Sequence, residues 1–149
     1  MAAGAWTVYN LAKKKIGNGT LSLASTAFRI TLHTSASNAN TATLGVYNSV
    51  TSEVTSGNGY SSSGKALANE VWTVGASAGQ YKMDFDDIVW TGTGGSIANI
   101  KFAVISLSAG TSAGRHLLCR SQLTTSQFTL ASGNTLTIAV NAAGAITLA

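Results

Sequence analysis

Residues 28–34 read FRITLHT, and the alternation of apolar and polar side chains in this stretch decides the fold class. In an extended chain Phe28, Ile30 and Leu32 point to one face, whereas the polar residues between them point to the other. A period of two predicts a β-strand that is buried on one face and meets solvent on the other. We therefore expect His33, on the polar face, to be a surface or hydrogen-bonded side chain.

The same period recurs along the chain. Apolar and polar residues alternate in 81–85 and 136–140, whereas 97–105 ends as a continuous apolar run typical of a strand buried on both faces. Residues 146–148 form a last short strand. Turns rich in glycine and asparagine separate these segments, at 17–19, 57–59, 92–95, 132–134 and 143–144. Such spacing is typical of a sandwich or barrel, and we expect an all-β, single-domain antiparallel β-sandwich, jelly-roll-like, over residues 1–149.

Two local departures from this pattern carry further expectations. Val8, Leu11 and Ile16 are spaced as on a helix that ends at Gly17, so residues 1–19 form a short N-terminal helix or an extended arm. If they form an arm, deletion of residues 2–16 leaves a folded β-domain that no longer attaches to its partner.

The second departure is a change of phase near residue 86. Apolar side chains fall on odd numbers up to Phe85 and on even numbers from Ile88 onward. A shift by one residue within a β run predicts a β-bulge, and the pair Asp86-Asp87 is its natural place.

Composition limits the classes of partner. The chain of 149 residues has 45% hydrophobic but only 9% charged residues and a net charge of +4, against about 25% charged residues in ordinary soluble proteins. A surface of hydroxyls, amides and small apolar groups has weak electrostatic protection against association, which suits a protein of an assembly or of an extracellular setting. One short basic cluster is not the broad basic face of a nucleic-acid-binding protein.

Membrane and redox signals are also weak in this sequence. We find no secretory signal and no apolar run of the ~18 residues that a membrane span needs. The single cysteine, Cys119, excludes an intrachain disulfide and lies in an apolar stretch, so we expect a buried, inert thiol. A soluble product that folds in a reducing cytoplasm fits best.

Residues 59–66, GYSSSGKA, are one residue short of a Walker A phosphate-binding loop. Ala66 stands where Ser or Thr would bind Mg²⁺, the segment before the loop is polar, and β-type residues rather than a helix follow it. The sequence therefore predicts a surface turn and no nucleotide site.

The sequence offers few other catalytic or metal-binding groups. It has two histidines, His33 and His116, five acidic residues and no Gly-x-Ser-x-Gly motif, so we expect no catalytic residue and no enzyme. Asp84, Asp86 and Asp87 could supply oxygen ligands for Ca²⁺, but without an EF-hand pattern a solvated acidic turn is favoured. We expect no metal and no cofactor.

Aromatic and basic residues of two segments are the candidate partner-binding groups. An aromatic residue beside a basic run suits docking onto a protein or an acidic surface, although the N-terminal aromatics could equally close one end of the core. The candidates are Trp6, Tyr9, Lys13, Lys14, Lys15, Tyr60 and Lys65.

Several segments resemble small structural proteins of tailed bacteriophages. The resemblance covers most of the chain, but it rests on turn and strand residues rather than on chemistry. The segments that carry it are 6–10, 12–13, 16–20, 28–32, 58–60, 64–67, 89–91, 94–97, 102–105 and 133–138.

The resemblance implies a non-enzymatic virion protein that is assembled in the host cytoplasm. Within that group we expect a capsid decoration (cement) protein that binds the major capsid protein as a homo-oligomer, without nucleic-acid or membrane partners. The alternative is a collar, tail or fibre accessory, or a carbohydrate- or receptor-binding module with Tyr60, Trp72 or Trp90 as a stacking platform.

Overall fold

Strand β2 (Phe28–Thr34) lies inside the larger of two β layers, as its alternation predicts. The computed structural model describes residues 4–24, 26–108, 110–111 and 113–148. The strand order of the large sheet is β1-β8-β7-β2-β3, and β9 also pairs with β7. These strands are β1 (Trp6–Val8), β3 (Lys65–Ala66), β7 (Ile97–Leu107), β8 (Leu117–Gln122) and β9 (Phe128–Leu130).

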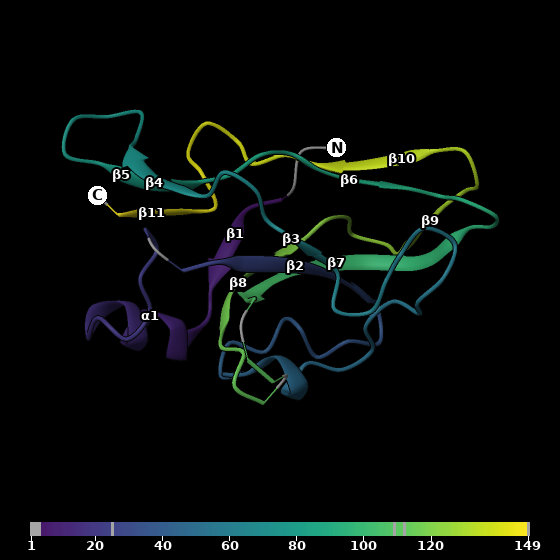
Figure 1. Ribbon diagram of the computed structural model, residues 1–149, viewed down its shortest axis with the longest axis horizontal. Helices are drawn as coiled ribbons and strands as arrows, with labels where there is room; N and C mark the ends of the chain where they lie inside the picture. The colour runs from purple at the N-terminus through teal and green to yellow at the C-terminus, as the bar shows by residue number, and fades with distance from the viewer. Residues whose placement is uncertain (1–3, 25, 109, 112, 149) are drawn as a thin grey trace.

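The second layer consists of two small sheets that lie side by side over the large one (Figure 1). One has the order β11-β5-β4, and the other pairs β6 with β10. All pairings of the described strands are antiparallel, so the expected all-β antiparallel sandwich is confirmed. The strands of this layer are β4 (Val71–Val74), β5 (Tyr81–Asp84), β6 (Ile88–Thr91), β10 (Thr135–Ile138) and β11 (Ile146–Leu148).

The core between the layers is formed by large apolar side chains from both. Phe28 and Ile30 of the large sheet and Met83 and Trp90 of the small sheets have no exposed surface. Burying a side chain of this size contributes about 1.5–3 kcal/mol. Within the described residues no helix is long and apolar enough to cross a membrane.

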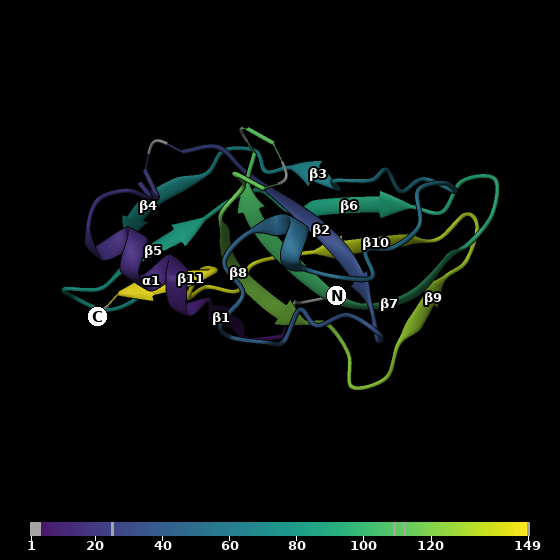
Figure 2. The same cartoon turned by 90° about the horizontal axis from the view of Figure 1, so that it is seen from below.

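The opposite face of the large sheet is also covered. Residues 35–64, which include the 3-10 helix η1 (Tyr47–Ser49), run beneath it, and Figure 2 shows this segment crossing β2 and β7. The expectation that β2 is buried on one face only is therefore wrong, because Thr31 and His33 have 0% exposure. The side chains of Thr31 and His33 are satisfied locally, since His33 Nδ1 lies 3.1 Å from the Thr51 carbonyl oxygen and Nε2 lies 2.9 Å from Thr31 Oγ1.

Residues 6–17 belong to the fold. Helix α1 (Asn10–Gly17) confirms the predicted short helix. The strand β1 before it pairs with β8, with Val8 opposite Cys119. Tyr9 between them is fully buried, and its hydroxyl donates a hydrogen bond of 2.7 Å to the Ala39 carbonyl. The extended-arm alternative is thus wrong for residues 6–17, and deleting residues 2–16 would remove an edge strand and part of the core.

The predicted bulge at Asp86-Asp87 is a change of strand partner. Strand β5 ends at Asp84 and pairs with β4 and β11, whereas β6 begins at Ile88 and pairs with β10. Residues 85–87, of which Asp86 and Asp87 are exposed, connect the two small sheets, so the phase change was predicted correctly but its cause was not.

We expect Tyr9 to contribute as a core residue. Substitution Tyr9→Ala should lower the free energy of unfolding by about 3–5 kcal/mol, because it leaves a cavity. Tyr9→Phe should cost only about 0.5–1.5 kcal/mol, the usual net value of one hydrogen bond. Urea denaturation followed by tryptophan fluorescence measures both, with the exposed Lys14→Ala as control. A Tyr9→Ala protein as stable as this control would restore the arm interpretation.

We expect His33 to make stability fall in mild acid. Burial lowers the pKa of His33 below its ordinary value, so the unfolded chain binds the proton more readily. The contribution of neutral His33 to the free energy of unfolding is complete above the pKa of the unfolded chain, about 6.5. It is lost as the pH falls below that value, by at most about 1.4 kcal/mol per pH unit. Denaturation between pH 7.5 and 5 (a window of roughly the histidine range) should show a steeper loss for the wild type than for His33→Gln. Parallel profiles would contradict this role.

Candidate protein-interaction surface

The segment that resembles a phosphate loop is a tight structural connection. Gly59 and Gly64 have φ angles of 97° and 64°. A Cβ on Gly59 would lie 2.0 Å from the Thr91 carbonyl oxygen, and one on Gly64 would lie 1.8 Å from that of Ile30. Residues 65–66 then pair with β2 as β3, and no helix follows. The glycine spacing therefore reflects close backbone approach, not a phosphate cradle.

The carboxylate of Glu53 holds this connection in place. Its Oε1 accepts hydrogen bonds of 2.7 Å from the Tyr60 hydroxyl and 2.7 Å from the Ser63 amide, and its Oε2 accepts one from the Tyr47 hydroxyl. The Tyr60 hydroxyl in turn accepts a bond of 3.0 Å from the Leu32 amide of β2. This group, the Glu53 network, joins residues 47–63 to the large sheet.

A buried arginine extends the Glu53 network. The Arg115 guanidinium lies 4.0 Å from the centre of the Tyr47 ring and donates to the Leu107 carbonyl at 3.0 Å. It also donates to the Ser63 hydroxyl at 3.2 Å. Burial and the hydrogen bond to Glu53 raise the pKa of Tyr47 to about 12, so its hydroxyl stays a donor at neutral pH. Because these groups are paired with one another, the network stabilises the fold and offers no free reactive group.

The aromatic candidates are mostly inside the protein. Tyr9 and Tyr60 are 0% and 2% exposed, and Trp6 is half-buried. Trp90 is 0% exposed. Tyr60 and Trp90 therefore do not serve as sugar-stacking platforms on this surface. Trp72 is half-buried and stacks on Tyr81, with the ring centres 6.4 Å apart.

The basic candidates remain on the surface. Lys13 and Lys14 are exposed and Lys15 is half-exposed on α1. Lys65 is exposed on β3, and its ammonium donates a hydrogen bond of 2.6 Å to the Val89 carbonyl of β6, which ties the two layers together. Cys119 is buried as expected, and burial raises the pKa of its thiol.

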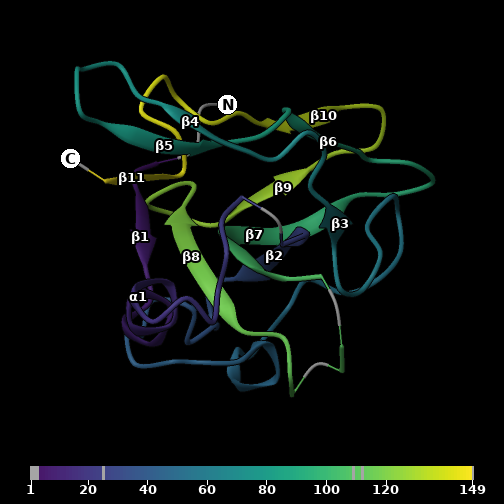
Figure 3. The same ribbon diagram turned by 60° about the vertical axis from the view of Figure 1, so that its left-hand side comes forward.

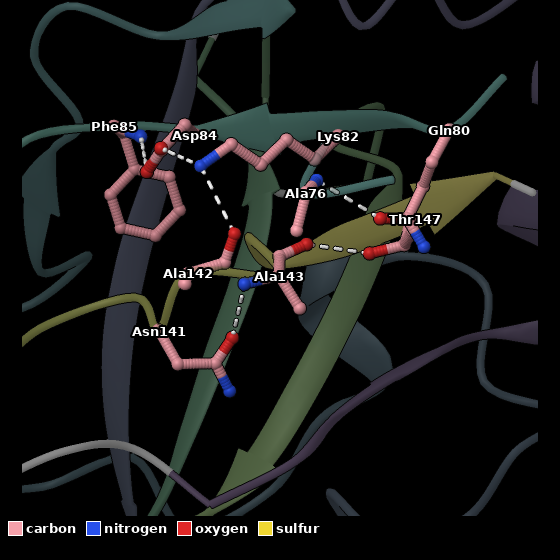
Figure 4. A network of polar contacts seen from close by, with 9 residues as sticks. All are labelled: Ala76, Gln80, Lys82, Asp84, Phe85, Asn141, Ala142, Ala143 and Thr147. Carbon is pink, nitrogen blue, oxygen red and sulfur yellow. Dashed lines mark hydrogen bonds and ion pairs between the residues drawn. The ribbon is translucent and has the colours of Figure 1, made fainter. Parts of the chain in front are cut away.

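The acidic cluster is engaged in local contacts. Asp84 forms an ion pair of 2.7 Å with Lys82, whose ammonium also donates to the Ala142 carbonyl at 3.2 Å (Figure 4). Asp86 accepts a bond of 2.7 Å from the Asn69 side chain. Within the described residues no group of three His, Cys, Asp or Glu side chains is placed to hold a metal ion.

One end of the sheet β11-β5-β4 extends beyond the core. Met83, which faces inward, is 0% exposed, whereas Tyr81 on the same face is 48% exposed. Its neighbours in register, Val74 and Leu148, are 61% and 55% exposed. We call Trp72, Val74, Tyr81 and Leu148 the apolar overhang.

Two hollows lie between the apolar overhang and helix α1. One, of about 390 Å³, is lined by Ile16, Leu21, Leu23, Trp72 and Leu148 among others. The second, of about 360 Å³, is lined by residues that include Val8, Lys13, Ile16, Ile146 and Leu148. Because Ile16 and Leu148 border both, we treat the hollows as one groove, the α1–β11 groove. Figure 3 shows β11 above α1 at this end, with β1 between them.

Sequence reasoning identified only part of this surface. It singled out Lys13 and the neighbouring lysines, but it did not identify Val74, Tyr81 or Leu148. The strand pattern shows which residues share a face of a sheet. It does not show which of them lie at an end of the sheet that the opposing layer leaves uncovered.

Comparison with known proteins adds no relative. No protein-family model, no curated protein and no solved structure matches this chain.

We expect the Glu53 network to be essential for stability. Glu53→Ala leaves the buried Tyr60 hydroxyl and two further donors without their acceptor, at about 1–3 kcal/mol for each buried donor. Glu53→Gln retains an acceptor oxygen and should be less destabilising. The control Asp87→Ala, at an exposed position, should change stability by less than about 0.5 kcal/mol. Urea denaturation curves rank the three variants, and a Glu53→Ala curve like the control's would show the network to be dispensable.

Proposed function

We propose that this protein is a non-enzymatic virion structural protein, specifically a capsid decoration (cement) protein that binds the major capsid shell. The observation that carries the proposal is the apolar overhang beside the lysines of α1. Its residues Val74, Tyr81 and Leu148 are between 48% and 61% exposed and lie together on one face. A cluster of exposed apolar residues rimmed by polar groups is typical of a protein-binding surface.

The remainder of the molecule suits a passive load-bearing role. Glu53 and Arg115 join residues 35–64 to the large sheet, and Lys65 links the large sheet to strand β6 of the second layer. A rigid domain loses little conformational freedom on docking, so the contact energy is retained as affinity. Bound in many copies across capsomer junctions, such domains add contacts that outward pressure must break as well.

The resemblance to small structural proteins of tailed bacteriophages supports the same proposal. The low content of charged residues, 9%, also favours a protein that spends its life in an assembly. The alternative is an accessory protein of the collar, tail or fibre, in which a few copies would bind their partner through the same surface. Symmetric oligomers are expected in either position.

The location in the particle tests this proposal. In purified virions, quantitative mass spectrometry should find on the order of hundreds of copies, as expected for multivalent decoration. Immunogold labelling should mark the head. A few copies at the tail or collar would replace decoration by the accessory role, and absence from the particle would refute the virion proposal altogether.

A further inference from the structure

We propose that the α1–β11 groove binds an extended acidic segment of another protein, with apolar side chains in its hollows and carboxylates at the lysines of α1. The identification of that protein as the capsid shell rests on the proposed function. The chemistry of the groove does not, because it follows from the residues that line it.

The floor of the groove selects apolar side chains. Ile16 and Leu148 border both hollows, and Leu21, Leu23 and Trp72 line the larger one. The hollows, of about 390 and 360 Å³, are within the range of about 300–1,000 Å³ typical of ligand pockets. Each therefore has room for apolar side chains of a partner, and filling it covers Leu148, which is 55% exposed in the free protein.

The rim of the groove selects negative charge. Lys13 lines the smaller hollow, and Lys14 and Lys15 follow it on α1 but line neither hollow. The ion pair Lys82–Asp84 is the only one within the described ranges, so the three lysines have no carboxylate within salt-bridge distance there. No acidic side chain lines either hollow. Phosphate groups alone would match the charge but leave the apolar floor exposed, so an acidic polypeptide fits better than a nucleic acid.

The edge of the sheet favours an extended conformation. Strand β4 is the last strand in the order β11-β5-β4, so its outer edge pairs with no other strand of the described chain. Its sequence, Val-Trp-Thr-Val, has neither charge nor proline, which are the usual protections of an edge strand. An added strand would form backbone hydrogen bonds there and direct every second side chain toward Trp72 and the groove, so the carboxylates that reach Lys13 belong to residues beside the strand rather than between its apolar residues.

A second copy of this chain does not supply the required segment. The chain has five acidic residues, and four of them have partners within their own molecule. Only Asp87 remains, and it cannot provide acidic groups for three lysines. The acidic residues with partners are Glu53, Glu70, Asp84 and Asp86.

A synthetic peptide in which a leucine-containing stretch is flanked by aspartates, labelled with fluorescein, tests the inference by fluorescence anisotropy. The full-length wild type should bind it, and added salt should weaken binding because the charges are exposed. Lys13→Glu/Lys14→Glu/Lys15→Glu and, separately, Leu148→Asp should each weaken binding at least about tenfold. Peptides with lysine in place of aspartate, or serine in place of leucine, should bind far more weakly.

Two control variants make single changes of the same kind at positions away from the groove. Lys101→Glu reverses a charge on β7, and Val89→Asp places a carboxylate on the outer face of β6, where Val89 is 41% exposed. Both should bind the peptide like the wild type, and thermal unfolding should confirm that all variants are folded. The inference is overturned if the wild type binds no peptide, if the lysine peptide binds equally well, or if the controls lose as much affinity as the groove variants. Lysine-dependent binding to phosphatidylserine vesicles without peptide binding would also overturn it, by assigning the surface to lipid.

Attachment to particles separates this inference from the proposed function. If the wild type decorates heads and the triple lysine variant still attaches, the groove assignment fails while the function stands. If the wild type is absent from virions, the function fails, and the peptide result still decides the chemistry of the groove.

Discussion

The carboxylate of Glu53 is the contact on which the arrangement of layers depends. It accepts hydrogen bonds from Tyr47, Tyr60 and Ser63. The Tyr60 hydroxyl also accepts a hydrogen bond from the backbone amide of Leu32 in β2. Residues 35–64 contain little regular structure of their own, and only isolated backbone bridges, such as His33–Glu53 and Val46–His116, join them to the large sheet and its flanks. Side-chain hydrogen bonds to one charged acceptor add to these bridges, and charge-assisted bonds are the stronger kind.

Because both faces of the large sheet are covered, the surface that can bind a partner lies elsewhere in the molecule. The buried polar residues His33 and Arg115 bond to residues 35–64 and Thr31 bonds to His33, so none of the three is available to partners. The upper sheets pack on the other face. Unmatched apolar surface therefore gathers where β4, β5 and β11 extend past the core, next to α1. The candidate interaction surface is thus a consequence of unequal layer lengths.

The fold was largely predictable from local pattern, because alternation in segments such as 28–34 and 97–105 depends only on neighbouring residues. The buried Cys119 was predicted in the same way, and a short helix ending at Gly17 was one of the two alternatives for the N-terminal segment. Burial of His33 and pairing of β1 with β8 were not, since both depend on segments distant in sequence. The candidate surface was predicted only at its lysines and at Trp72. Val74 and Leu148 look like ordinary strand residues until the opposing layer is known to end short of them.

The pairing of β1 with β8 also bears on how the chain folds during synthesis. Val8 leaves the ribosome before its partner Cys119, which is made 111 residues later (119 minus 8). At about 5–20 residues per second, β1 and the apolar side of α1 remain without their partner for many seconds. Long-range pairing of this kind slows folding and leaves strand edges open meanwhile. The low charge of the chain gives those edges little protection, so expression yield should depend on how fast the last third of the chain follows the first.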